Sequence, residues 1–118
     1  MSTGKKGTLE AIRHDLLQSS ASLLAGNETD ALGIALRHLF PGIAYAFVLH
    51  WIPEQAEDIY WVLVSPTEVA EIEVPRDGYV EGNTPLLKVL DAAAYQKQRH
   101  SRDVRQRLEI GLELIKSR

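Results

Sequence analysis

The sequence contains no cysteine, and this absence removes several kinds of chemistry at once. Disulfides, zinc sites built on thiolates, iron–sulfur clusters and a cysteine nucleophile are all excluded. Long apolar runs are also absent, because the longest, residues 43–49, is far shorter than the roughly 20 residues that a transmembrane helix needs. Lys5 and Lys6 are followed by an amphipathic segment, which is not typical of a secretory signal. We therefore expect a cytoplasmic protein that crosses no membrane.

Recognisable catalytic and ligand-binding motifs are missing as well. No glycine-rich phosphate loop occurs, no serine stands in the glycine-flanked turn of a serine hydrolase, and the four histidines include no pair at helical metal-binding spacing. The sequence therefore predicts no catalytic residue, no metal ligand and no cofactor. One alternative stays open: His50 and Glu54 are the closest histidine and acid near a predicted strand end, and a small enzyme would need a cleft that gathers His50 with an acid.

The 118 residues are 45% hydrophobic and 25% charged, which is the balance of one ordinary globular domain. Apolar residues recur at helical spacing over residues 8–25, and a second helix is predicted over 28–39 with Asn27 or Thr29 as its N-cap. Residues 1–7 precede the first apolar stripe and are expected to form a flexible N-terminus. Residues 8–118 then make a single α+β domain.

Alternating or apolar segments rich in β-branched residues predict strands at residues 43–52, 59–64 and 68–74, with a short edge strand at 79–81. In the first strand, strict alternation places Val48 and His50 on the same face. The short connections between these strands favour antiparallel pairing.

Two further helices are predicted after the strands. Thr84 before Pro85 is typical of a helix start and predicts a helix over residues 84–96, and an apolar stripe predicts a last helix over 101–116. The expected fold class is therefore α+β: an antiparallel sheet of three to four strands with helices packed on one face, in the order αα-βββ(β)-αα.

Charge is distributed unevenly along the chain. Residues 54–81 hold eight acids and one base, for a net charge of −7, whereas the rest of the chain carries +4. Carboxylates that project from one rigid sheet face create a negative field that steers and orients a basic partner. We therefore expect a non-enzymatic protein-binding module, such as an immunity- or antitoxin-type inhibitor or an adaptor, that engages a basic protein.

The predicted partner-binding residues combine these acids with one aromatic side chain: Glu57, Asp58, Trp61, Glu68, Glu71 and Glu73. Trp51 and Tyr60 lie in the same strands and are further candidates, because exposed tryptophan and tyrosine dominate the energetics of many interfaces.

Cations near the C-terminus support a different hypothesis. They are Lys97, Arg99, Arg102, Arg105 and Arg107. Such a stretch can bind the phosphates of nucleic acid, although no aromatic residue follows Tyr95 to stack on bases. We keep a regulatory or nucleic-acid-associated protein as the alternative. Self-association remains open in every case, because a strand edge can be left uncovered.

Overall fold

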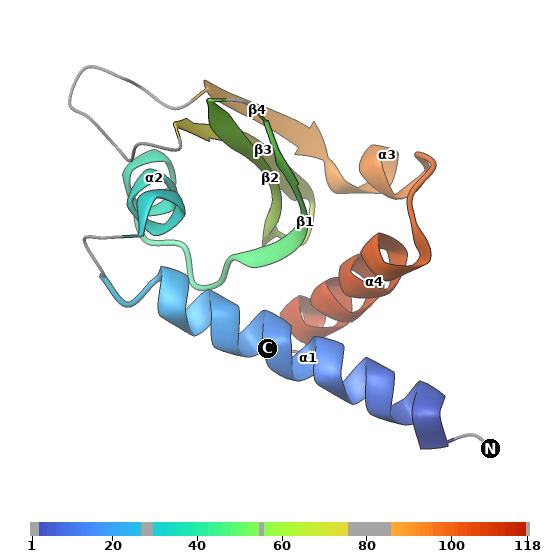
Figure 1. Cartoon of the computed structure of the whole chain (residues 1–118). Helices are drawn as coiled ribbons and strands as arrows, with labels where there is room; N and C mark the ends of the chain where they lie inside the picture. The colour runs from blue at the N-terminus through green and yellow to red at the C-terminus, as the bar shows by residue number, and fades with distance from the viewer. Residues whose placement is uncertain (1–2, 27–29, 55, 76–85, 118) are drawn as a thin grey trace.

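The computed structural model describes residues 3–26, 30–54, 56–75 and 86–117. These residues form a four-stranded antiparallel sheet and four helices, which confirms the predicted α+β class and element order. The elements are α1 (Thr3–Leu23), α2 (Ala31–Leu39), β1 (Phe47–Pro53), β2 (Glu57–Ser65), β3 (Glu68–Pro75), β4 (Leu86–Asp91), α3 (Ala92–Gln96) and α4 (Arg102–Lys116) (Figure 1). None of the described helices is long and apolar enough to span a bilayer.

The sheet is a simple meander in which each strand pairs antiparallel with the next, in the order β1-β2-β3-β4. The alternation along β3 is confirmed, because Ala70, Ile72 and Val74 are buried on one face while Glu71 and Glu73 are half-buried on the other. This alternation follows from the period of two that a pleated strand imposes on its side chains.

The helix predicted over residues 84–96 is wrong over residues 86–91. Leu86–Asp91 instead forms β4, which pairs along β3, and only Ala92–Gln96 is helical. The carboxylate of Asp91 accepts a hydrogen bond from the Ala94 backbone N–H at 3.0 Å and so caps α3. Local helix preference is weak, and the backbone partners that β3 offers override it here. The short strand expected at 79–81 lies outside the described residues.

Helices cover both faces of the sheet, whereas the sequence suggested one. The side that α2 covers, called the α2 face, supplies these buried residues to one core cluster: Val62, Val64, Ala70, Ile72 and Val74. The opposite side, called the α4 face, supplies these to a second cluster, which also holds buried residues of α3 and α4: Phe47, Leu49, Leu63 and Val69. Figure 1 shows the sheet between α2 on one side and α3 with α4 on the other.

A β-bulge in β1 changes which side chains share a face. The register with β2 shifts between Val48 and His50. Beyond the shift, His50 lies opposite Trp61 on the α4 face, and Trp51 lies opposite Tyr60 on the α2 face. The predicted alternation, which put Val48 and His50 on one face, is therefore wrong, because a bulge inserts an extra residue that periodicity does not count.

Helix α1 contacts β1 and joins the two halves of the core. Ile12 belongs to the cluster on the α4 face and Leu23 to the cluster on the α2 face. The buried hydroxyl of Ser20 accepts a hydrogen bond from the Ala46 backbone N–H at 2.8 Å, which fixes the chain that enters β1. Because α1 begins at Thr3, the described part of the predicted N-terminal segment is helical.

Candidate functional site

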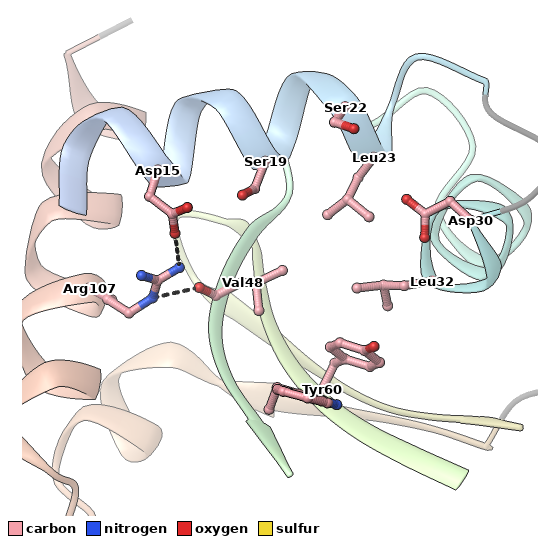
Figure 2. A pocket seen from close by; sticks show the side chains of 10 residues that line it. Asp15, Ser19, Ser22, Leu23, Asp30, Leu32, Val48, Tyr60 and Arg107 are labelled. Carbon is pink, nitrogen blue, oxygen red and sulfur yellow. Dashed lines mark hydrogen bonds and ion pairs between the residues drawn. The ribbon is translucent and has the colours of Figure 1, made fainter. Parts of the chain in front are cut away.

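Two hollows lie on opposite faces of the sheet. The first, on the α2 face, is the aspartate groove, whose lining includes Asp15, Asp30, Trp51, Tyr60 and Arg107. It has a volume of about 470 Å³ and is bounded by α1, the start of α2 and the strands β1 and β2 (Figure 2). The lining is mainly apolar with a few charged groups, as is common for binding sites.

The start of α2 forms one wall of this groove. Asp30 is the N-cap, and its carboxylate accepts the Gly33 backbone N–H at 3.2 Å; residues 27–29, where a cap was expected, lie outside the described residues. A Cβ on Gly33 would lie 2.7 Å from the Leu23 carbonyl oxygen, so glycine permits the close approach of α2 to the end of α1. The same carbonyl accepts a hydrogen bond from Arg37 at 2.7 Å.

Two stacked aromatic rings lie on the sheet side of the groove. The rings of Trp51 and Tyr60 are 6.3 Å apart between centroids and inclined by 19°. Trp51 remains 51% exposed, the largest exposure of any large hydrophobic residue in the described part of the chain. A large ring that is already held in place and still open to solvent is suited to contact a partner.

Carboxylates make the surroundings of these rings electronegative. Burial raises the pKa of Tyr60, and the negative charges of Asp58 and Asp30 raise it further. Figure 2 shows the side chains of Asp30 and Tyr60 pointing into the groove from α2 and β2. Within the described residues, Asp30 forms no ion pair. A cation that entered the groove would therefore meet both a ring face and the carboxylate of Asp30.

Arg107 lies at one end of the groove, and its side chain is engaged in contacts within the protein. Its Nε donates to the Val48 carbonyl oxygen and its NH2 to Asp15, each at 2.9 Å, and its side chain is 16% exposed (Figure 2). This arginine was one of the cations predicted to bind phosphate. The structure uses it internally, whereas the other residues of that basic stretch are exposed: Lys97, Arg99, Arg102 and Arg105.

The second hollow is the α3–α4 cleft, which lies on the α4 face and whose lining includes Trp61, Glu71, Lys88, Arg99 and His100. Its volume is about 440 Å³. Trp61 donates its indole Nε1–H to Glu71 at 2.9 Å. Lys88 on β4 lies opposite Glu71 in the strand register.

Tyr95 and His100 line the α3–α4 side of this cleft. Their ring centroids are 4.3 Å apart, and a ring nitrogen of His100 is hydrogen-bonded to the Tyr95 carbonyl oxygen. Burial raises the pKa of Tyr95 to about 12, with a further contribution from the charge of Glu71. The phenol therefore stays protonated near neutral pH and can serve there as a hydrogen-bond donor but not as a base.

The cleft also gathers His50 with an acid, as the enzyme alternative requires, but the acid is Glu71 rather than Glu54. The His50 ring lies 5.3 Å from the Trp61 ring. Within the described residues, no hydrogen bond joins His50 to a carboxylate, and one oxygen of Glu71 is already engaged by Trp61. The described residues also contain no group of three or more side chains placed to hold a metal ion.

The predicted partner-binding residues are divided among different places. Trp61, Glu71 and Glu73 lie together on the α4 face of β2 and β3. Asp58 belongs to the α2 face, since it alternates with Tyr60 along β2. The remaining two lie at opposite ends of the hairpin: Glu57 begins β2, and Glu68 follows the turn, where it accepts a hydrogen bond from a serine hydroxyl.

No protein-family model matches this chain, and searches against curated proteins and solved structures find no significant match. Functional proposals therefore rest on the two hollows. The sequence predicted Asp30 only as part of the helix over residues 28–39 and did not place Lys88 or Arg99 in a cleft. No local signal identifies them, because β4 was predicted as helix and the cleft forms only when β4 joins the sheet.

Proposed function

We propose that the chain is a cytoplasmic, non-enzymatic protein-binding module that engages a basic partner, and that the aspartate groove receives a cationic side chain of that partner. The observation that carries this proposal is the exposed Trp51–Tyr60 stack, which lies on one face with Asp58 and beside Asp30. Lysine and arginine side chains bind the faces of aromatic rings, and tryptophan is the most favourable ring.

The groove combines two contributions to affinity. A cation over a tryptophan ring gains about 0.5 to 2 kcal/mol, depending on how far it is desolvated. The carboxylates of Asp30 and Asp58 attract the cation from a distance and orient it on arrival. Asp15, by contrast, contributes little net charge because Arg107 pairs with it.

The other acidic residues support the same class of partner. Glu57, Glu68, Glu71 and Glu73 add to the negative field of the sheet without lying in the groove. Such a field accelerates encounter with a cationic protein and is weakened by salt. An immunity- or antitoxin-type inhibitor of a basic protein is one concrete form of this function, and it is supported by the small size and acidic charge of the chain.

A direct test uses the two tryptophans, which lie on opposite faces and so report on the two hollows separately. The uniformly ¹⁵N-labelled protein is titrated at low salt with a short lysine-rich peptide, and the two indole N–H signals are followed by NMR. The Trp51 signal should shift, the Trp61 signal should not, and added salt should reverse the shift. An acidic peptide of the same length is the control. A response of Trp61 alone, or of neither indole, would contradict the proposal.

Variants separate the groove from net charge. Asp30→Asn retains the helix cap, because asparagine caps as well as aspartate, and Asp58→Asn removes the second charge. The double variant Asp30→Asn with Asp58→Asn should bind the lysine-rich peptide about tenfold more weakly, which corresponds to about 1.4 kcal/mol. Glu109→Gln with Glu113→Gln changes the net charge equally on the exposed side of α4 and should leave binding nearly unchanged.

A further inference from the structure

The α3–α4 cleft has the size and walls of a small-molecule site. Its volume of about 440 Å³ lies within the roughly 300 to 1,000 Å³ typical of ligand pockets. Apolar and aromatic side chains make up much of its lining: Ile52, Trp61, Leu90, Tyr95 and Val104. They come from the sheet on one side and from α3 and α4 on the other, so the hollow is built by several elements that the fold holds together.

The charged groups in this lining favour an anion. Lys88 and Arg99 both line the cleft, and within the described residues neither side chain forms a hydrogen bond or an ion pair. Among the described residues of the lining, Glu71 is the one carboxylate, and one of its oxygens already accepts the indole hydrogen of Trp61. Among the described lining residues, the two cationic side chains therefore outnumber the one carboxylate, in a chain whose net charge is −3.

The start of α4 adds to this preference independently. Ser101 lines the cleft and is the N-cap of the 15-residue helix α4, so the first turn of the helix starts at the cleft. The free backbone N–H groups and the dipole at a helix N-terminus stabilise negative charge, part of which Asp103 in the first turn of α4 already supplies. The Ser101 hydroxyl satisfies the Val104 N–H at 3.2 Å.

Aromatic rings provide surfaces for a flat group. The rings of His50 and Trp61 contact each other at the sheet, with centroids 5.3 Å apart, and those of Tyr95 and His100 contact each other at the α3–α4 turn, with centroids 4.3 Å apart. A planar ring buried beside such side chains gains stacking as well as the transfer of its apolar surface from water.

We propose that the α3–α4 cleft binds a small molecule in which a flat aromatic ring carries an anionic group, either a carboxylate or a phosphate. The ring packs beside Trp61, and the anion lies near Lys88, Arg99 and the start of α4. This site is separate from the aspartate groove on the other face, so a small ligand and a basic partner are able to bind at the same time.

The test compares matched ligands with and without charge. Naphthoate and naphthamide differ in the anionic group, and phenyl phosphate and phenol provide a second pair. Binding is followed by the Trp61 indole signal in NMR and by fluorescence of the Trp51→Phe variant, in which Trp61 is the remaining tryptophan. We expect each anion to bind at least about tenfold more tightly than its neutral partner, with the Trp51 signal unmoved.

Variants assign the charge to the cleft. Arg99→Gln and Lys88→Gln should each weaken naphthoate binding several-fold, while Arg102→Gln, exposed and outside the lining, should not. Both cleft residues are exposed, so the variants should fold, and urea unfolding checks that they do. Equal affinity for charged and neutral ligands, a response at Trp51 instead of Trp61, or no binding of either anion up to its solubility limit would overturn the proposal.

Discussion

Trp61 on β2 donates its indole hydrogen to Glu71 on β3 at 2.9 Å, and the two residues lie directly opposite each other in the strand register. The bond engages a half-buried carboxylate at the wall of the α3–α4 cleft and satisfies the one polar atom of the indole. Glu71 therefore differs from a solvated surface acid, although the sequence predicted it only as one of the carboxylates that project from the sheet toward a partner.

The Trp61–Glu71 hydrogen bond should contribute measurably to the free energy of unfolding. Glu71→Ala leaves the indole N–H without its partner and should lower the free energy of unfolding by about 1 to 3 kcal/mol. Glu71→Gln retains an oxygen acceptor and should cost less. Urea unfolding measures both changes, with Glu113→Ala on the exposed side of α4 as the control, expected within about 0.5 kcal/mol of wild type. Equal losses for Glu71→Ala and Glu71→Gln would show that this bond contributes little.

Tyr95 should make the protein less stable in strong base. Its pKa is about 12 in the folded protein, against 10.0 for an ordinary tyrosine, and its side chain is buried. Between these two pH values the unfolded chain loses the phenolic proton while the folded chain keeps it, so stability falls as pH rises. The slope approaches about 1.4 kcal/mol per pH unit, and the contribution is fully present below the unfolded pKa.

The comparison with Tyr95→Phe isolates this effect, because the other titrating groups are common to both proteins. The difference in unfolding free energy between wild type and Tyr95→Phe should be constant near neutral pH and should shift in favour of the variant above about pH 10. Parallel pH profiles for the two proteins throughout would mean that Tyr95 titrates normally.

Gly33 should be intolerant of a side chain. An added Cβ would meet the Leu23 carbonyl oxygen at 2.7 Å, and this backbone atom cannot move without shifting the end of α1. Gly33→Ala should therefore lower the melting temperature and disturb the aspartate groove. Gly7→Ala is the matched control in α1, where nothing lies within 4 Å of the new Cβ, and alanine should stabilise that helix by up to about 1 kcal/mol. Similar effects of the two substitutions would contradict the close helix approach.

Arg107 should stabilise the fold, whereas its neighbour Arg105 should not. Arg107→Ala removes the hydrogen bonds to Val48 and Asp15 and should cost about 1 to 3 kcal/mol. Arg105 is exposed, and within the described residues its side chain forms no hydrogen bond or ion pair, so Arg105→Ala should stay within about 0.5 kcal/mol of wild type. Chemical unfolding of both variants decides the matter, and a neutral Arg107→Ala would refute a structural role.

Periodicity was sufficient for β2, β3 and α4, because each has a strong pattern that its packing uses directly. The last helix begins one residue after Ser101, whose hydroxyl caps it as a serine at that position should. Periodicity was insufficient for Leu86–Asp91. Leucine and lysine suit either helix or strand there, and pairing with β3 determines which one forms.

The candidate sites were predicted less well than the fold, because they depend even more on contacts between segments that are distant in the sequence. Trp51, Tyr60 and Trp61 were recognised as aromatic anchors, but the bulge in β1 decides which of them share a face with His50. Lys88 and Arg99 reach the cleft only through the placement of β4 and the α3–α4 turn. Such groupings depend on contacts between distant segments, which a single sequence does not reveal.

The central claim is that a basic partner binds the aspartate groove. It is tested most directly by native pull-down from the cells that make the protein, at low and moderate salt, with bound protein and nucleic acid both identified. Four baits are compared: wild type, Asp30→Asn with Asp58→Asn, Glu109→Gln with Glu113→Gln, and Glu71→Lys with Glu73→Lys, which reverses charge on the opposite face.

We predict that wild type and the Glu109/Glu113 control retain a stoichiometric basic protein and that the Asp30/Asp58 variant loses it. The Glu71/Glu73 variant should retain the basic protein less well than wild type, because it alters the negative field of the sheet and not the groove. This loss should be larger at low salt than at moderate salt, since salt screens the field. Equal retention by the Asp30/Asp58 variant, or recovery of nucleic acid that leaves as salt rises, would contradict the account.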